Sequence, residues 1–507
     1  MEGTRTITRR CIRTGNLLIR IGLSESLKHK TVSGVTWSFV DNIANQGITF
    51  LVGLVLARLL SPEEYGLIGI ITIFIAVFNS IVDSGFSNAL IRKTDATNID
   101  YNTVFIANLL LSVVLFLILF ACAPSIGRFF DKLELVPLTR VMGFILIINA
   151  FAIIQRTLLV KRVDFKTQTK VSLIASISSG VIGICMAFVG LGVWSLVGQQ
   201  VSRQLLNAYF LWYYAKWLPA IQFSLHSFKE LFGFGWKLLV SELINTIWNE
   251  IYQVVIGKCY SAQMLGQYTR SKQFASIFSS NLTTVIQRVS YPVLSSIQDD
   301  KERLKLAYQR VIKVAMLVTF ICMIGLAAIA KPMVVVLIGE KWLIAATLLP
   351  VICFNMMLYP LHALNLNMLQ VQGRSDLFLK LEIVKKIVAV VPVLFGLFIN
   401  IYWMLWGSVF TGIIAYYLNA YYSGKILNYS ISMQLKDIYP SLGIAVVMGG
   451  VVYSVSFLPL SASLLLLIQL FVGAIITWGL CEITHRDEYV EIKTIILSVL
   501  QKVKNGK

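Results

Sequence analysis

The chain has few charged residues and few of the residues that form catalytic or metal centres. Only 14% of its 507 residues are charged, with 25 acidic against 44 basic side chains. The four histidines lie far apart without HExxH spacing, and the seven cysteines are scattered without a CxxC pair. A GxxxxGK[ST] loop for ATP is also missing. We therefore expect no metal centre, no disulfide framework and neither enzymatic nor ATP-driven activity.

The N-terminus lacks the features of a secretory signal. Residues 1–30 are basic but contain neither an uninterrupted apolar core nor a small-residue cleavage site. Residues 16–28 fit two alternatives that the sequence leaves open, a short interfacial amphipathic helix or part of a disordered basic tail. The formal net charge of +19 is divided among short tails and loops rather than gathered in one patch. This distribution argues against nucleic acid as a partner.

Long apolar runs dominate what is present. The chain is 57% hydrophobic with a mean hydropathy of +0.76, which is typical of a polytopic membrane protein. A β-barrel would show strands of half this length with alternating polarity, so the fold class is predicted to be all-α. Windows of about twenty apolar residues mark about fourteen transmembrane helices. These spans are residues 35–60, 65–91, 103–123, 138–160, 171–189, 193–214, 235–257, 265–293, 307–330, 343–369, 377–398, 402–424, 439–457 and 462–481.

Basic residues alternate between the two sides of this map. If the N-terminal tail is cytoplasmic, every second loop is rich in Arg and Lys. One such loop carries Arg156, Lys161, Arg162, Lys166 and Lys170. The loops between these are short and carry few positive charges. The positive-inside rule therefore predicts an even number of helices and cytoplasmic termini.

Two stretches repeat about 200 residues apart in the same membrane orientation, which predicts two lobes related by an axis along the membrane normal. Residues 34–37 (GVTW) match residues 233–236 (GFGW), and ARLLSPEEYG at 57–66 matches GKCYSAQMLG at 257–266. We predict a basic tail (1–33), a first six-helix lobe (34–230), a second (231–424), two further helices (425–481) and a C-terminal tail (482–507).

Several short motifs identify the chain as similar to one transporter family. It resembles polysaccharide exporters of the PST type, the Wzx-like flippases of the multidrug/oligosaccharidyl-lipid/polysaccharide (MOP) superfamily. The motifs that carry the resemblance are ARLLSPEEYG at 57–66, DSGF at 83–86, RVDF at 162–165, GVWSLV at 192–197 and VSYP at 289–292.

The resemblance implies a MATE-like, V-shaped fold of two six-helix lobes plus two C-terminal helices. It also implies translocation of undecaprenyl-pyrophosphate-linked oligosaccharides across the bacterial inner membrane by alternating access, for capsule, O-antigen or exopolysaccharide assembly. Membrane lipids, a polysaccharide polymerase and other assembly proteins are the partners that it implies.

Polar residues within the spans predict a water-filled cavity, because ionisable groups in a bilayer usually face protein or water. At 100° per residue, polar side chains form stripes on the first, seventh and eighth helices. The predicted lining residues are Asn42, Asn45, Ser241, Asn245, Asn249, Gln253 and Asn281.

Four basic residues are expected to bind the diphosphate, since Arg and Lys suit a multiply charged anion. They are Arg270, Lys272, Arg288 and Arg58. Competing interpretations are that Arg58 snorkels from a helix end and that Arg288 pairs with a carboxylate at the cytoplasmic rim.

Four carboxylates have two possible roles. They are Asp41, Asp83, Glu242 and Glu250. Either they bind H⁺ or Na⁺ and couple an ion gradient to export, since buried acids are readily protonated, or they are counter-ions to neighbouring Arg and Lys. Apart from such an ion, no cofactor is expected.

Two other functions remain open at this stage. A cation-coupled multidrug antiporter of the same fold needs net acidic cavity walls, whereas a lipid diphosphate needs basic ones. A non-transporting scaffold of a polysaccharide assembly complex leaves the polar stripes unexplained. The sequence leaves open the exported glycan, the coupling ion and whether coupling exists.

Overall fold

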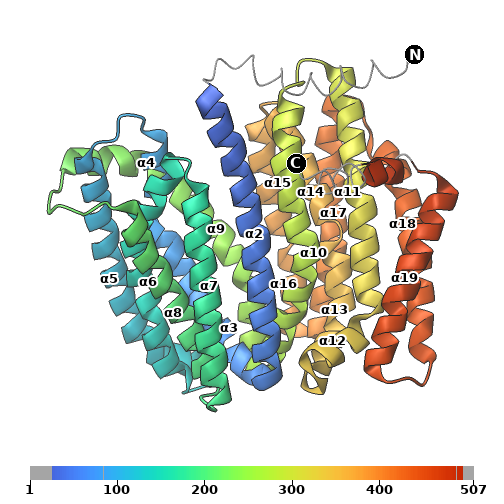
Figure 1. Ribbon diagram of the computed structural model, residues 1–507, viewed down its shortest axis with the longest axis horizontal. Helices are drawn as coiled ribbons and strands as arrows, with labels where there is room; N and C mark the ends of the chain where they lie inside the picture. Colours follow the sequence, from blue (N-terminus) through green and yellow to red (C-terminus); the bar gives the residue numbers. More distant parts are fainter. Residues whose placement is uncertain (1–24, 84, 487, 495–507) are drawn as a thin grey trace. The chain divides into compact units, whose positions relative to one another are not determined.

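The computed structural model describes residues 25–83, 85–486 and 488–494 (Figure 1). These residues form helices joined by turns, and none of them lies in a strand. Residues 16–24 of the predicted interfacial segment lie outside this range. The first helix that the structure describes, α2, begins at Glu25, before the repeat starts at residue 34.

The chain forms two compact units. Unit 1 comprises Met1–Leu56 and Phe74–Ile247, and unit 2 comprises Ala57–Ile73 and Trp248–Lys507. Three helices pass from one unit to the other: α2 (Glu25–Leu59), α3 (Pro62–Asp83) and α9 (Leu225–Cys259). The turn between α2 and α3 therefore belongs to unit 2, although it comes from the first repeat.

Within unit 1, closely packed helix pairs surround an aromatic core. Among the described residues, the helices that lie wholly in this unit are α4 (Phe86–Arg92), α5 (Asn98–Phe129), α6 (Leu135–Lys161), α7 (Phe165–Phe188) and α8 (Trp194–Ala215). Glycines bring α7 and α8 together, since a Cβ on Gly183 would lie 2.8 Å from Gln199 and one on Gly198 would lie 2.3 Å from Met186. Small residues at such contacts are typical of helix packing in membranes.

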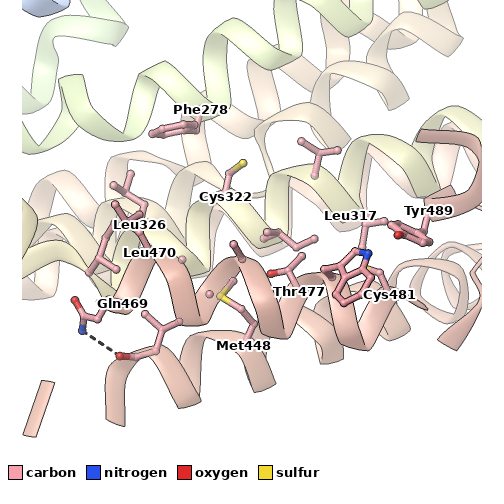
Figure 2. A pocket seen from close by; sticks show the side chains of 18 of the residues that line it. Phe278, Leu317, Cys322, Leu326, Met448, Gln469, Leu470, Thr477, Cys481 and Tyr489 are labelled. Carbon is pink, nitrogen blue, oxygen red and sulfur yellow. Dashed lines mark hydrogen bonds between the residues drawn. The ribbon is translucent and has the colours of Figure 1, made fainter. Parts of the chain in front are cut away.

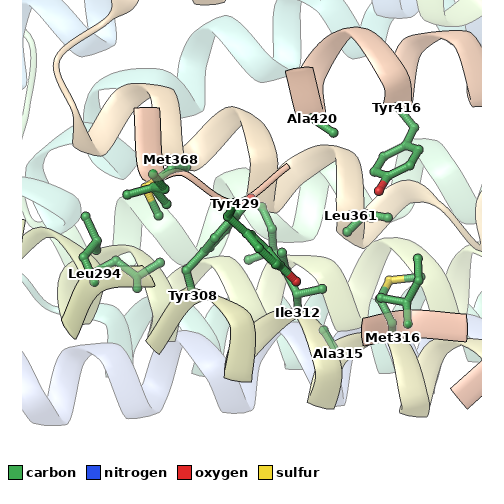
Figure 3. Packing of buried hydrophobic residues seen from close by; sticks show 14 of the residues in the cluster. Leu294, Tyr308, Ile312, Ala315, Met316, Leu361, Met368, Tyr416, Ala420 and Tyr429 are labelled. Carbon is green, nitrogen blue, oxygen red and sulfur yellow. The ribbon is translucent and has the colours of Figure 1, made fainter. Parts of the chain in front are cut away.

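Unit 2 contains the remaining helices around a larger core (Figure 3). Tyr308 and Tyr429 are fully buried there, and Asn365, Ser423 and Gln434 form a hydrogen-bonded polar group beside them. The helices with described bounds are α10 (Ala262–Ser295), α11 (Lys301–Ala328), α12 (Ala330–Ile338), η2 (Glu340–Trp342), α13 (Leu343–Met356), α14 (Tyr359–Val371), α15 (Ser375–Val388), α16 (Val390–Phe398), α17 (Ile401–Leu427), α18 (Ile431–Ser454), η3 (Val455–Phe457) and α19 (Ala462–Thr484), and residues 488–494 are helical as well.

Two predicted spans are broken rather than continuous. The span at 343–369 divides into α13 and α14, and the span at 377–398 divides into α15 and α16. Pro360 lies in the first turn of α14 and Pro392 in the first turn of α16. Proline has no N–H to donate and fits the first turn of a helix, so it favours a new helix start at both places.

Ten helical stretches of the described residues are long and apolar enough to cross a membrane. This confirms the prediction of an all-α polytopic membrane protein. The other four predicted spans are not among these ten helical stretches; they correspond to α8, α9, α10 and α15–α16. Helices α9 and α10 are continuous over 35 and 34 residues, so their polar side chains rather than their length set them apart. The count of fourteen stays a prediction.

Candidate functional site

The two repeated turns meet inside unit 2. Ser61 and Glu64 form reciprocal hydrogen bonds at the start of α3, and Ser261 accepts a hydrogen bond from the Met264 amide at the start of α10. Each serine satisfies an amide that the first helical turn leaves without a partner. The aligned serines at 61 and 261 therefore cap two equivalent helices.

Arg270 lies beneath this turn and is buried. Its guanidinium carbon lies 3.9 Å from the centre of the Tyr65 ring and 5.9 Å from that of Trp342, and one terminal nitrogen donates to Gln273. Its Nε has no hydrogen-bond partner, and no carboxylate of the described chain forms an ion pair with it. A water-facing cation was expected, whereas this structure closes Arg270 off under aromatic rings.

Lys272 and Glu250 are both half-buried in unit 2 and interact electrostatically. Gln253 also donates a hydrogen bond to the Glu250 carboxylate. A predicted diphosphate-binding cation and a predicted coupling acid are thus neighbours, which favours the counter-ion role for Glu250.

Asp41 in unit 1 is at the centre of a polar group that joins α2 to α7. Its carboxylate accepts hydrogen bonds from Asn45 (2.5 Å) and Ser172, and Asn45 in turn accepts one from Ser176 (2.7 Å). Arg203 on α8 interacts electrostatically with Asp41. Asp41, a predicted coupling acid, and Asn45, a predicted lining residue, are therefore in contact, with a cation beside them.

Asp83 has similar surroundings at the end of α3. It accepts a hydrogen bond from Ser87 (2.6 Å) and interacts electrostatically with Arg156 on α6. Arg156 and Arg203 were not among the predicted site residues. The sequence around Arg203 could have identified it, because Arg203 follows the polar residues Gln199, Gln200 and Ser202 within an apolar span.

The other predicted residues lie outside these groups. Arg58 donates to the carbonyl groups of Val336 and Leu337 (2.9 Å to the latter) at the end of α12, so its side chain caps a helix. Arg288 is exposed towards the end of α10. The remaining members are Asn42 (half-buried, α2), Ser241, Glu242, Asn245 and Asn249 (exposed, α9), and Asn281 (half-buried, α10).

An apolar groove of about 550 Å³ lies between α10, α11, α18 and α19 (Figure 2). Phe278 lies on its α10 side, and Tyr489 lies at the end near Cys481. Gln469 is a rare polar member, and its amide donates to the Val452 carbonyl (3.0 Å). The sequence could not indicate this groove, because its residues resemble the lipid-facing residues of any apolar helix.

Known proteins match this chain in sequence. A family model described as a polysaccharide biosynthesis protein matches residues 55–347. The teichuronic acid biosynthesis protein TuaB of Bacillus subtilis is 27% identical over 69% of this chain and 73% of its own length. The lipopolysaccharide biosynthesis protein WzxC of Escherichia coli is 24% identical over 73% of this chain and 76% of its own.

Solved structures match the fold. The lipid II flippase MurJ in its inward closed conformation has a TM-score of 0.72 at 15% identity, covering 90% of this chain and 99% of that one. An inward-facing multidrug MATE transporter of the MOP superfamily has a TM-score of 0.60 at 18% identity, covering 76% and 94%. These likenesses confirm the predicted MATE-like fold.

Proposed function

We propose that this chain, which belongs to the family of polysaccharide biosynthesis proteins, is a flippase for undecaprenyl-pyrophosphate-linked oligosaccharides. It acts as a transporter and not as an enzyme, in the bacterial inner membrane with both termini in the cytoplasm. The exported units feed capsule, O-antigen or exopolysaccharide assembly.

One feature of α10 carries this proposal. Phe278 lines the apolar groove, and Arg270 and Lys272 lie on the same helix. Six residues separate Lys272 from Phe278, which is roughly 9 Å along an α-helix. A lipid diphosphate is an apolar chain joined to a strong anion, and α10 carries both a residue that lines an apolar groove and, farther along the same helix, two cations.

Arg270 supports the proposal in a second way. A buried cation without a carboxylate is costly, and such a charge is usually retained where it acts on a ligand. The Tyr65 ring offsets only part of this cost, because a cation–π contact contributes about 0.5–2 kcal/mol. An anionic substrate supplies the missing counter-charge when Tyr65 moves away.

The acidic residues fit the multidrug alternative less well. Asp41, Asp83 and Glu250 each lie beside an Arg or Lys that offsets the negative charge. A drug-cation site needs carboxylates that are available to the drug. Glu242, which is exposed on α9, is the acid that we propose for coupling to H⁺ or Na⁺.

Export of labelled lipid-linked oligosaccharide tests the function. The purified protein is reconstituted into liposomes containing an undecaprenyl-pyrophosphate oligosaccharide, and transfer is followed by a lectin added outside. We expect transfer with the wild type, and a loss of at least about tenfold with Arg270→Ala, which corresponds to about 1.4 kcal/mol of substrate interaction. Arg310→Ala is the matched control, because Arg310 forms an exposed ion pair with Glu491.

A deletion strain separates the alternatives. We expect lipid-linked glycan to accumulate on the cytoplasmic leaflet while dye efflux is unchanged. Normal glycan export with defective dye efflux would contradict the flippase function and favour the multidrug antiporter. Lost polysaccharide assembly in cells, with no transfer by the purified protein, would favour the scaffold.

A further inference from the structure

The loop between the two repeats carries exposed apolar side chains on a fixed backbone. This linker loop comprises residues 216–224, between the end of α8 and the start of α9. Leu218 is 79% exposed, Ile221 is 101% exposed and Phe223 is 51% exposed. The loop lies beside the first turns of α5 (Figure 1). Neighbouring exposed apolar side chains usually mark a surface that binds another protein or a membrane.

Two buried side chains of α5 hold the linker loop on both sides of Ile221. The Ala220 amide donates to Oδ1 of Asn102 (2.9 Å), and the Ser224 amide donates to Oγ1 of Thr103 (3.0 Å). Asn102 and Thr103 are almost completely buried. The backbone is therefore fixed, so Ile221 cannot fold back onto the protein to hide from water.

An aromatic contact anchors the beginning of the loop in the core of unit 1. The Trp217 ring packs edge-on against Tyr101 (6.4 Å between ring centres) and Phe105 (5.9 Å). Trp217 points inwards and the next residue, Leu218, is left exposed. The linker loop therefore has two apolar sides. Trp217 packs on the protein, whereas Leu218 is exposed.

The position of the linker loop along the membrane span α5 indicates that it lies at the membrane surface. Helix α5 is a candidate membrane span that begins at Asn98. Asn102 is its fifth residue, so it lies roughly 6 Å from the start of the helix. The loop that Asn102 holds is therefore level with the end of a membrane span. Tyr209 and Tyr213 on α8 are also strongly exposed, as is usual for aromatic residues at a membrane interface.

The charge of the segment also suits a lipid surface. Lys216 begins the loop and is exposed, and no acidic residue occurs before Glu230. Glu230 is paired with Lys93 (2.9 Å). Apolar side chains flanked by basic ones are the pattern of segments that bind the headgroup region of anionic membranes.

We propose that the linker loop is a membrane anchor, in which Leu218, Ile221 and Phe223 insert between phospholipid headgroups of the adjacent leaflet. By the positive-inside pattern this is the cytoplasmic leaflet. The anchor fixes the connection between the two repeats to the bilayer surface. Lipid binding by this loop does not depend on the flippase function.

Site-specific fluorescence in liposomes tests the anchor. A cysteine-free form of the full chain carries Ile221→Cys labelled with the environment-sensitive dye NBD, in vesicles of phosphatidylethanolamine and phosphatidylglycerol. We expect blue-shifted emission, strong quenching by lipids with a doxyl group near the headgroup, and little quenching by aqueous iodide. Gln222→Cys is the matched control, because this neighbouring polar side chain is also exposed and should be quenched by iodide.

Two results would overturn the proposal. Equal iodide quenching at both positions, without doxyl quenching, would place the loop in water. Protection at position 221 from both quenchers would mean that a second copy of the chain covers it. A second variant removes doubt about folding: Ile221→Asp should leave the melting temperature unchanged while a dye at Leu218→Cys becomes accessible to iodide.

Discussion

Gly66 and Gly266 bring the two repeated turns into backbone contact. A Cβ on Gly66 would lie 1.7 Å from the Ala262 carbonyl oxygen, and one on Gly266 would lie 1.8 Å from that of Pro62. Residues 62 and 262 are equivalent in the repeat, as are residues 66 and 266. Each glycine therefore meets the equivalent residue of the other repeat, as expected where two copies of one motif cross. Only glycine permits such an approach.

Gly66→Ala should destabilise unit 2, because the new methyl group meets backbone atoms that cannot move aside. We expect a loss of about 3 kcal/mol or more, at the upper end of the cost of overpacking, measured as a lower melting temperature in detergent. Gly443→Ala on α18 is the control, since nothing lies within 4 Å of a Cβ there. It should be neutral or slightly stabilising. Equal stability of the two variants would contradict the contact.

The stacking of Arg270 on Tyr65 predicts a difference between two substitutions of Tyr65. Tyr65→Phe keeps the ring face on which Arg270 stacks and removes only the buried hydroxyl. It should therefore retain export and stability. Tyr65→Leu removes the ring and should lower stability by about 1–2 kcal/mol through loss of the cation–π contact. The measurements are melting temperature and lectin-detected transfer, and a defect in Tyr65→Phe would show that the hydroxyl matters.

The neighbouring charges of Asp41 and Arg203 should be coupled energetically. Asp41→Asn leaves Arg203 without its counter-charge and should destabilise the protein, whereas Asp41→Asn with Arg203→Gln should recover part of the loss. A double-mutant cycle measures this coupling, which we expect to be about 1–3 kcal/mol for a partly buried pair. Additive effects would mean that the two side chains act independently.

Filling the apolar groove should block export without unfolding the protein. Gly325 lines the groove, and a Cβ there would make an ordinary contact with Met448 at 3.4 Å. Gly325→Leu therefore places a side chain where the lipid chain is proposed to bind. Export should fall at least about tenfold, a cost of about 1.4 kcal/mol, with little change in melting temperature. Gly479→Leu, outside the groove, should export normally, and equal export by both would remove the groove from the lipid path.

Sequence patterns were most informative where a physical constraint repeats along the chain. Apolar runs predicted helices because a bilayer leaves the backbone no other hydrogen-bond partners. They also predicted helices α9 and α10, at residues 235–257 and 265–293, although polar side chains keep both helices out of the ten stretches that are apolar enough to cross a membrane. They did not predict the short breaks in the helix near Pro360 and Pro392. Spacing predicted a polar stripe on the first helix, and two of its polar residues, Asp41 and Asn45, are joined by a hydrogen bond in the structure.

Partners across helices could not be predicted in this way. Arg156 and Arg203 were missed because a single cation in an apolar span has the same pattern whether it snorkels or pairs. Arg58 was expected to bind substrate, yet its side chain caps α12, almost 280 residues further along the chain. The electrostatic interaction of Lys272 with Glu250 likewise depends on where α9 and α10 lie in the folded chain.

Composition, periodicity and motifs are local properties, and they were sufficient to predict an all-α membrane protein of the polysaccharide exporter type with an internal repeat. Three features became visible only in the folded chain: the repeated turns cross at Gly66 and Gly266, Tyr65 covers Arg270, and an apolar groove lies beside α10. These features depend on distances between segments far apart in the chain. Such distances follow from packing, which no local pattern of residues specifies.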